Sequence, residues 1–467
     1  SIGFRIHASK RYITLAPVAD IIGIAFRVVD PDGLLERQYG QSVDGEITLA
    51  LLRRGTRGLS ASEYTDPLGI GFSNGFVECH GTEISVDDVI GGENGLGQGW
   101  KMLMEALAAG RGIALPAGAA GSSKMLTNAT AAYSALRHQF KTPIGKFEGI
   151  REKIAEMALA TYEIDALVAL MNTALDNGEK PPIFSAVLKQ RSTELGRVVV
   201  NHAMDIVAGS AICMGPQNFV APAYFSTPVG ITVEGSNTMT RSLLIFGQGL
   251  IRSHPHLLDI VHAIEANDRQ SFAMHVTQTV KSVVGLVLSV GGRGPLEEAV
   301  RFFALSANAS LLLGGDLKRR EFISGRYADL LSYCLAGYAA EWHAKHSGAP
   351  SSILDAFRAR NMFRIHATAK ELVANHPHSL LHRAILWRTI GSANALDLND
   401  ALKTTIATEL QTKGSKLRAL FSEDTLMLHP NVRRMETALG GSADDSIFEV
   451  DRFHLSDDGK LTQTSDK

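Results

Sequence analysis

The spacing of apolar residues changes near residue 91, and this change constrains the fold more than any other feature of the sequence. Before it, β-branched and apolar residues form short runs at 11–15, 21–29 and 47–52, separated by clusters of Gly, Pro and Asp. After it, apolar positions recur every three or four residues. The first pattern is typical of antiparallel strands and the second of amphipathic helices. We therefore predict a mainly α fold that begins with a β segment.

Three later segments carry apolar stripes at helical spacing. They cover residues 154–175, followed by Gly178, residues 184–206 and residues 323–338. Long helices with such stripes pack as neighbours in a bundle. A turn-like break at residues 254–256 separates the second stripe from the third. The sequence thus predicts two helical regions.

These patterns divide the chain into four parts. A partial antiparallel β-domain is expected over residues 1–90, a helical bundle over 91–253 and an additional helical domain over 254–438. Residues 439–467 are rich in Asp and Glu and show little apolar periodicity, so an acidic, loosely ordered tail is expected there. Because Ser1 lies inside the β pattern, we expect the chain to be a fragment of a longer protein.

The composition narrows the classes of function. Lys and Arg number 46 against 48 Asp and Glu, which argues against nucleic-acid binding, because general affinity for nucleic acid needs clustered positive charge. The three cysteines form no CxxC pair, so neither a disulfide framework nor a Cys-rich zinc site is indicated and a reducing cytoplasm is expected. The longest apolar stretch, residues 283–290, is far shorter than the ~20 residues that cross a bilayer, so no membrane span is predicted.

Several common catalytic motifs are missing from the sequence. It has no Walker loop, no HExxH helix, no nucleophile elbow and no GxGxxG between a strand and a helix. The histidines within residues 254–262 and 376–382 suggest a metal site, but no acidic partner lies at ligand spacing and a proline enforces a turn in each cluster. Polar residues at the entrance to a helix explain both clusters, so no metal ligand is predicted.

The most informative segment is residues 230–241. An apolar, β-branched approach delivers one carboxylate, Glu234, just before a turn of small residues and a new helix. A turn that presents Glu234 into an apolar cavity would make the carboxylate a stronger base. Alternatively, Glu234 only complements the helix dipole, with Ser236 or Asn237 as the N-cap. The residues alone leave both interpretations open.

Residues 234–249, which read EGSNTMTRSLLIFGQG, resemble the catalytic-glutamate segment of the acyl-CoA dehydrogenases, most closely the large bacterial type of fatty-acid β-oxidation. Three further segments match this family in order. Residues 11–14 resemble the strand beside the flavin ring, residues 97–111 resemble the first C-terminal helix, and residues 137–146 resemble the loop that contacts the flavin. Residues 251–467 resemble the additional helical domain of the large bacterial members, without catalytic motifs.

The resemblance implies a fold and an activity. The family has an N-terminal helical domain, a middle β-domain and a C-terminal helical bundle, with FAD bound between the domains and across a subunit interface. The N-terminal helical domain and the first half of the β-domain would precede Ser1. The implied reaction is α,β-dehydrogenation of a fatty acyl-CoA to the trans-2-enoyl-CoA. Electron-transfer flavoprotein or a similar acceptor, a homodimer and a bacterial cytoplasmic location are expected, with peripheral association with the inner membrane left open.

The resemblance also implies roles for individual residues. Glu234 would be the catalytic base, because Gly110 stands where some branches carry the alternative carboxylate. Arg111 and Gly235 would contact the substrate. Ala208 stands where the family has a glycine. The residues expected to contact FAD are Thr14, Arg137, His138, Gln139, Phe140, Gly209, Ser236, Asn237 and Thr238.

Each of these assignments has a structural alternative. Thr14 could be an ordinary strand residue, Arg137 a solvated cation at a helix end, and Arg111 a salt-bridge partner in the bundle. Two other functions compete with the dehydrogenase. One is a flavoprotein of the same fold with another activity, and the other is a helical interaction module without catalysis.

Overall fold

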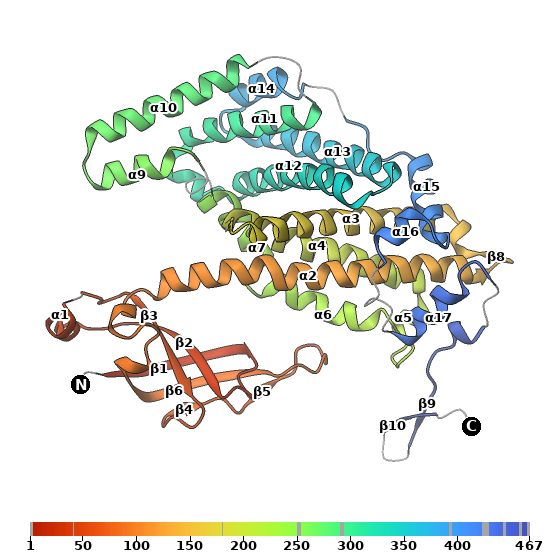
Figure 1. Ribbon diagram of the computed structural model, residues 1–467, viewed down its shortest axis with the longest axis horizontal. Helices are drawn as coiled ribbons and strands as arrows, with labels where there is room; N and C mark the ends of the chain where they lie inside the picture. Colours follow the sequence, from red (N-terminus) through yellow and green to blue (C-terminus); the bar gives the residue numbers. More distant parts are fainter. Residues whose placement is uncertain are drawn as a thin grey trace. The chain divides into compact units, whose positions relative to one another are not determined.

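The computed structural model describes residues 3–40, 42–179, 181–249, 254–289, 294–391, 395–422, 429–441, 445–456 and 460–464. The chain forms two compact units, Ser1–Gly110 and Arg111–Lys467. Their boundary lies inside one long helix, α2(Gly99–Leu136) (Figure 1). The predicted domain boundary at residue 90 differs from this division, because the start of α2 belongs to the first unit.

Two antiparallel sheets form the first unit. In the larger sheet, β1 pairs with β6, and the short strands β4 and β5 also pair with β6. In the smaller sheet, β2 pairs with β3. Apolar side chains from both sheets meet in one buried cluster, made of Ile6, Ile24, Ala50, Leu52, Cys79 and Ile84. The strand bounds are β1(Gly3–Thr14), β2(Ile21–Arg27), β3(Ile47–Arg53), β4(Leu59–Ser60), β5(Tyr64–Thr65) and β6(Asn74–Ser85).

The predicted strands are confirmed. The runs at 11–15, 21–29 and 47–52 largely coincide with the end of β1, with β2 and with β3. Alternate residues of β2 and β3 are buried, as expected of strands with one face on a core. The short helices of this unit are α1(Leu34–Tyr39), η1(Val86–Asp88) and η2(Gly92–Gly95).

A helical bundle begins the second unit. The helices α2, α3 and α4 run alongside one another (Figure 1) and contribute to one buried apolar cluster. The predicted stripes at 154–175 and 184–206 lie in α3 and α4 and supply much of that cluster, so the helical prediction is confirmed. The elements here are β7(His138–Gln139), β8(Thr142–Pro143), η3(Ile144–Lys146), α3(Glu148–Asp176), α4(Pro182–Val207), α5(Gly209–Ile212), α6(Ala221–Thr232), α7(Asn237–Met239) and the π-helix η4(Thr240–Gln248).

The later helices pack directly on this bundle. The hydroxyl of Tyr162 in α3 donates to the carbonyl oxygen of Ala340 in α12, at 2.9 Å, and the same apolar cluster continues through α12, α13 and α15. The predicted stripe at 323–338 is confirmed within α12. The bounds are α9(Leu257–Glu265), α10(Arg269–Leu288), α11(Pro295–Ser310), η5(Leu311–Arg319), α12(Glu321–Ser347), α13(Ser351–Asn375), α14(Ser379–Arg388), α15(Asp400–Gln411), α16(Lys416–Leu420) and α17(Pro430–Ala438).

Some residues of the acidic segment at the end pack on the bundle. Leu439 and Ile447 are buried in the core of the bundle, and Asp451 accepts a hydrogen bond of 2.8 Å from the backbone N–H of Gln217. The loosely ordered tail stays a prediction for the rest of this segment, while a few apolar residues dock these positions although the segment lacks periodicity. The remaining elements are η7(Asp445–Phe448), β9(Phe453–Leu455) and β10(Leu461–Gln463). No helix in the described ranges is both long and apolar enough to cross a membrane.

Candidate active site

The turn between α6 and α7 presents Glu234. Glu234 and Gly235 both adopt left-handed backbone conformations, with φ of 55° and 87°. This conformation is natural for Gly235 but costs a residue with a Cβ about 1 kcal/mol or more. Ser236 then caps α7, because its Oγ accepts a hydrogen bond of 3.3 Å from the N–H of Met239. The N-cap at Ser236 is therefore present, and Glu234 stands two residues before it in a strained position.

Lys189 of α4 lies under this turn. Its ammonium group donates hydrogen bonds of 2.8 Å to the carbonyl oxygen of Gly235 and to Oδ1 of Asn237. The amide of Asn237 in turn donates to Thr193 Oγ1 and to Glu194 Oε1, both at 2.9 Å. Side chains from two successive turns of α4, Lys189 on one and Thr193 and Glu194 on the next, therefore hold the Glu234 turn. Sequence reasoning missed Lys189, although a lysine inside an apolar stripe was a visible signal.

The charged groups around Lys189 shift its pKa in opposite directions. Its side chain is fully buried, and burial is the main cause that lowers the pKa of Lys189 to about 8. The negative charges of Glu234 and Glu194 oppose this shift, whereas the positive charge of Arg111 adds to it. Glu234 itself is exposed. Of the two open interpretations, the one that places Glu234 in an apolar cavity does not match its exposed position in this chain by itself.

Arg111 and Gly235, the two residues expected to contact the substrate, lie close together. A Cβ atom on Gly235 would lie 4.0 Å from a guanidinium nitrogen of Arg111. The Nε atom of Arg111 is buried and has no hydrogen-bond partner among the described residues. A buried donor without a partner costs free energy unless a bound group supplies an acceptor. The geometry therefore provides a donor beside the Glu234 turn.

The loop after α2 forms a tight hairpin of β7 and β8. Phe140 and Lys141 occupy its tip with φ of 51° and 65°, values that hairpin turns usually give to Asn or Gly. The Phe140 side chain is 89% exposed. Arg137 is half-buried, with its guanidinium 5.3 Å from the centre of the Phe448 ring, so it is not the fully solvated cation of the alternative interpretation. His138 and Gln139 are exposed on the same hairpin.

Ala208 ends α4 in a conformation that suits glycine. Its φ is 54° and its ψ is −126°. A residue with a Cβ is strained there, which explains physically why the family segment has a glycine at this position. Gly209, the predicted FAD contact, begins α5 directly afterwards and is exposed.

Thr14 belongs to the first compact unit, whereas the other candidate residues belong to the second. It is exposed at the end of β1, where its Oγ1 accepts a hydrogen bond of 3.4 Å from the amide of Asn74. Asn74 Oδ1 also accepts a bond of 2.6 Å from the hydroxyl of Thr65. Thr14 is thus part of an ordered polar group at the sheet edge.

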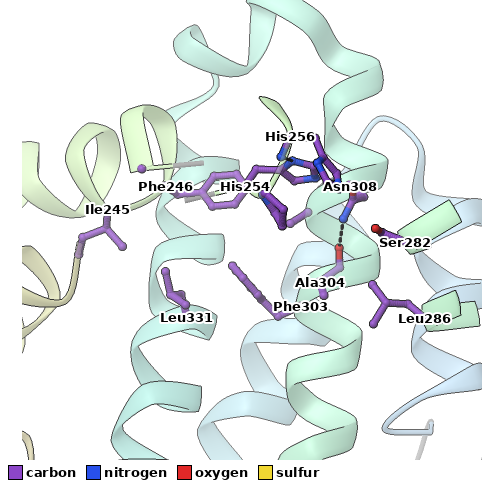
Figure 2. Close-up of a pocket in the computed structure, with 13 residues that line it drawn as sticks. Ile245, Phe246, His254, His256, Ser282, Leu286, Phe303, Ala304, Asn308 and Leu331 are labelled. Carbon is purple, nitrogen blue, oxygen red and sulfur yellow. Dashed lines mark hydrogen bonds between the residues drawn. The ribbon is translucent and has the colours of Figure 1, made fainter. Parts of the chain in front are cut away.

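A cavity of about 300 Å³ lies beside the helix that follows Glu234, and sequence reasoning missed it. Ile245 and Phe246 of η4 form one wall, and Figure 2 shows Phe303 and Leu331 pointing into the same space from two other helices. His254 hydrogen-bonds Asn308 at 3.1 Å at its edge. Glu234 is not among the lining residues. The cavity draws on the four helices η4, α10, α11 and α12 and on the segment before α9, so no single stretch of sequence could reveal it.

The histidine clusters do not form a metal site. No group of three His, Cys, Asp or Glu side chains in the described ranges could hold a metal ion. His382 instead bonds the Tyr327 hydroxyl at 2.9 Å, and its ring centre lies 3.7 Å from that of His376. These histidines are core residues.

Two family models match the chain. The model described as "Acyl-CoA dehydrogenase, C-terminal domain" matches residues 97–246. The model described as "Acyl-CoA dehydrogenase, C-terminal, bacterial type" matches residues 251–444. The two matches follow each other and account for most of the helical part of the chain.

Curated relatives and a solved structure agree with these matches. "Probable acyl-CoA dehydrogenase FadE10" of Mycobacterium tuberculosis (strain ATCC 25618 / H37Rv) is 27% identical over 208 residues, 44% of this chain and 30% of the relative. "3-(aryl)acrylate reductase" of Clostridium sporogenes is 27% identical over 205 residues, 44% of this chain and 51% of the relative. The chain therefore matches about a third to a half of their lengths.

The solved structure is an acyl-CoA dehydrogenase complexed with FAD from Bacillus anthracis. It has a TM-score of 0.69 and 18% identity, and the match covers 90% of this chain and 72% of that chain. The likeness extends over both helical regions and shows the same fold.

Proposed function

The chain belongs to the acyl-CoA dehydrogenase family, and on this basis we propose that it supplies the C-terminal catalytic part of an FAD-dependent dehydrogenase of fatty acyl-CoA in β-oxidation. The product would be the trans-2-enoyl-CoA. The observation that carries the proposal is the strained turn at Glu234 and Gly235, which holds an exposed carboxylate next to a glycine that faces Arg111. Strained backbone of this kind is concentrated at functional sites.

Glu234 would take the proton from Cα of the thioester. The electron pair of the broken C–H bond becomes the second bond between Cα and Cβ, and the proton stays on a carboxylate oxygen of Glu234. FAD, when bound, supplies the acceptor for the hydrogen that leaves Cβ with its electron pair, which no side chain can accept. Bound ligands would cover the exposed Glu234, and removal of water would strengthen it as a base.

Arg111 would bind the substrate side of the site. Its buried Nε–H has no partner in the described part of the chain, so an oxygen of the acyl-CoA would satisfy it. Gly235 would leave room for the thioester, since its left-handed φ of 87° disfavours any side chain.

The residues proposed to hold FAD are exposed or partly exposed, except for Asn237, which is buried. The tip of the hairpin projects Phe140 into solvent, which suits a contact with a bound group or a second subunit. The Ser236 hydroxyl caps α7, so its contribution to FAD would come through an oxygen lone pair or through the backbone. The proposed set is Thr14, Arg137, His138, Gln139, Phe140, Gly209, Ser236, Asn237 and Thr238.

The remaining parts of the proposal concern partners and location. Reduced flavin would pass its electrons to electron-transfer flavoprotein or a similar acceptor, and the protein would act as a homodimer in the bacterial cytoplasm. The three cysteines are all free, which fits a reducing compartment.

One relative supports an alternative reaction. The similarity to a protein named 3-(aryl)acrylate reductase fits a same-fold flavoprotein that reduces a conjugated double bond. Dehydrogenation and this reduction are opposite directions of related chemistry, so both would use Glu234 as the group that exchanges a proton at Cα.

Anaerobic mixing of the flavin-loaded protein with acyl-CoA thioesters of four to sixteen carbons tests the proposal. We expect the 450 nm band of the flavin to bleach rapidly with at least one saturated thioester. If no thioester bleaches the flavin, but 3-arylacrylates reoxidise the reduced flavin, the alternative is correct. If neither reaction occurs, the proposed activity is wrong.

A further inference from the structure

We propose that Lys189 is a positioning residue that holds the Glu234 turn in its reactive conformation, through hydrogen bonds from its ammonium group to the Gly235 carbonyl and the Asn237 side chain. The proposal rests on the proposed function, because it assigns Lys189 a role toward the base of that reaction. Lys189 lies on α4, 45 positions before Glu234, and its two hydrogen bonds end on Gly235 and Asn237, not on the Glu234 carboxylate.

The partners of Lys189 distinguish it from other buried cations. Its two hydrogen bonds of 2.8 Å end on a backbone carbonyl and on a side-chain amide oxygen, which are both neutral. A buried ammonium group without a paired carboxylate is costly. Three other lysines or arginines are buried in the described ranges, and each contacts a carboxylate: Lys124 with Asp165, Arg301 with Glu298, and Arg418 with Glu436. Packing alone does not explain why an ammonium group occupies this place.

The hydrogen bonds of the Lys189 ammonium group to the turn explain why a charged group is buried at this place. The Gly235 carbonyl accepts hydrogen bonds from Lys189 and, at 3.3 Å, from the Thr240 hydroxyl. These bonds fix the peptide between Gly235 and Ser236, one residue after Glu234, whose φ of 55° is unfavourable for a residue with a side chain. Without the ammonium group the carbonyl would lose its main donor, and the turn could relax toward an ordinary conformation.

The positive charge of Lys189 also helps to hold the Glu234 turn. The charged groups that face Lys189 are Glu234 on the turn, Glu194 on α4 and Arg111 on α2. A protonated Lys189 attracts the carboxylate of Glu234 toward its own side of the turn. Burial lowers the pKa of Lys189 to about 8, so the charge is lost as the pH rises through that value.

Substitution of Lys189 by Met and by Gln tests the proposal. Met removes both the charge and the donors, while Gln keeps one donor in a side chain of similar length. The matched control is Lys124→Met, which removes a buried ammonium group that pairs with Asp165, away from the turn. Two quantities are measured: hydrogen exchange at the backbone amides of residues 235–240 without substrate, and the rate of flavin reduction by acyl-CoA.

We expect Lys189→Met to raise exchange in the turn at least tenfold and to slow flavin reduction at least tenfold, with little change in acyl-CoA affinity. Lys189→Gln should lie between this variant and the wild type. In the wild type, the rate of flavin reduction and the protection factors of the turn should both fall above about pH 8, and Lys189→Gln should lack this dependence. Lys124→Met should lower the melting temperature and leave both readouts unchanged.

Unchanged exchange and a rate within twofold of wild type in the Lys189 variants would overturn the proposal. If the variants do not fold, wild-type protection factors that stay constant between pH 7 and 9.5 would overturn it equally. If the wild-type flavin is not reduced by any acyl-CoA, the proposed function fails, and the exchange measurements still decide whether Lys189 holds the turn.

Discussion

Arg241 and Asp329 form a bidentate ion pair that ties the helix after Glu234 to helix α12. The Nε of Arg241 lies 2.8 Å from Oδ1 of Asp329, and an Nη2 contact to Oδ2 completes the pair. The two residues are 88 positions apart, one in the segment that carries the proposed base and the other in the additional helical region. That region therefore directly supports the segment of the proposed active site.

Substitution Asp329→Asn should lower the free energy of unfolding by about 1 kcal/mol, because bidentate pairs that are partly exposed contribute on that scale. Urea denaturation followed by circular dichroism measures the change. Asp316→Asn is the matched control, since Asp316 forms an exposed pair with Arg319 within one turn of η5. The control should have little effect. Equal effects of the two variants would contradict the importance of the Arg241 pair.

A larger loss of stability is expected when Glu163 is substituted. This carboxylate is buried between Arg191 and Arg364. The Nε of Arg191 and an Nη of Arg364 contact its two oxygens, each at 2.8 Å. Because Glu163→Gln would leave two arginines without their carboxylate, the free energy of unfolding should fall by about 3–5 kcal/mol. Denaturant titration at pH 7 measures this loss, and a change below 1 kcal/mol would contradict it.

The same carboxylate should make stability depend on pH. Burial by itself would raise the pKa of Glu163, but the charges and hydrogen bonds of Arg191 and Arg364 lower it below its ordinary value of 4.5. Its contribution is therefore fully present above that value and is lost as the pH falls through the lower pKa of the folded state. We expect the difference in stability between wild type and Glu163→Gln to shrink below pH 4.5.

His376 should also make the stability of the fold depend on pH, in a range above the one in which Glu163 acts. Burial, followed by the charges of His382, His378 and Arg320, lowers the pKa of His376 from 6.5 to about 4. Protonation therefore favours the unfolded chain, so stability is full above pH 6.5 and declines as the pH falls toward 4. His376→Phe should reduce the decline in melting temperature between pH 6.5 and 4.5, whereas His454→Gln, at an exposed position that is not among the groups acting on His376, should not. Identical pH curves for wild type and His376→Phe would refute this.

Ala208→Gly should stabilise the protein. At φ 54° and ψ −126° the alanine side chain is strained, and glycine removes that strain at a smaller cost in chain entropy. We expect a gain of about 1 kcal/mol in the free energy of unfolding. Ala203→Gly, in the buried middle of α4, should instead destabilise the protein. A loss of stability in both variants would show that Ala208 is not strained.

The sequence predicted the helices and strands better than the contacts between them. Alternation and helical spacing are local signals, so strands β2 and β3 and helices α3, α4 and α12 could be recognised from residues close together in the chain. Leu439 and Ile447 show the limit of these signals, because their burial depends on a surface formed by distant helices. Periodicity contains no information about such docking.

The candidate site was predictable only in part. Glu234, its small-residue turn and the Ser236 cap are contiguous in sequence, and the resemblance indicated Arg111 as a neighbour of the site. Lys189 was not predicted, since its importance lies in two hydrogen bonds to residues more than 40 positions away. The exposure of Glu234 was also not predicted, because the sequence cannot show what covers a turn.

The base assignment is tested most directly by rapid-mixing measurement of flavin reduction in Glu234→Gln. The variant should bind FAD and acyl-CoA as the wild type does, because the amide preserves the shape of the side chain. Flavin reduction should slow by about 10²–10⁴-fold or more, the usual scale for loss of a general base. Glu179→Gln, an exposed carboxylate beyond the end of α3, should react at the wild-type rate. Rapid bleaching of the flavin by acyl-CoA in Glu234→Gln would contradict the assignment of Glu234 as the base.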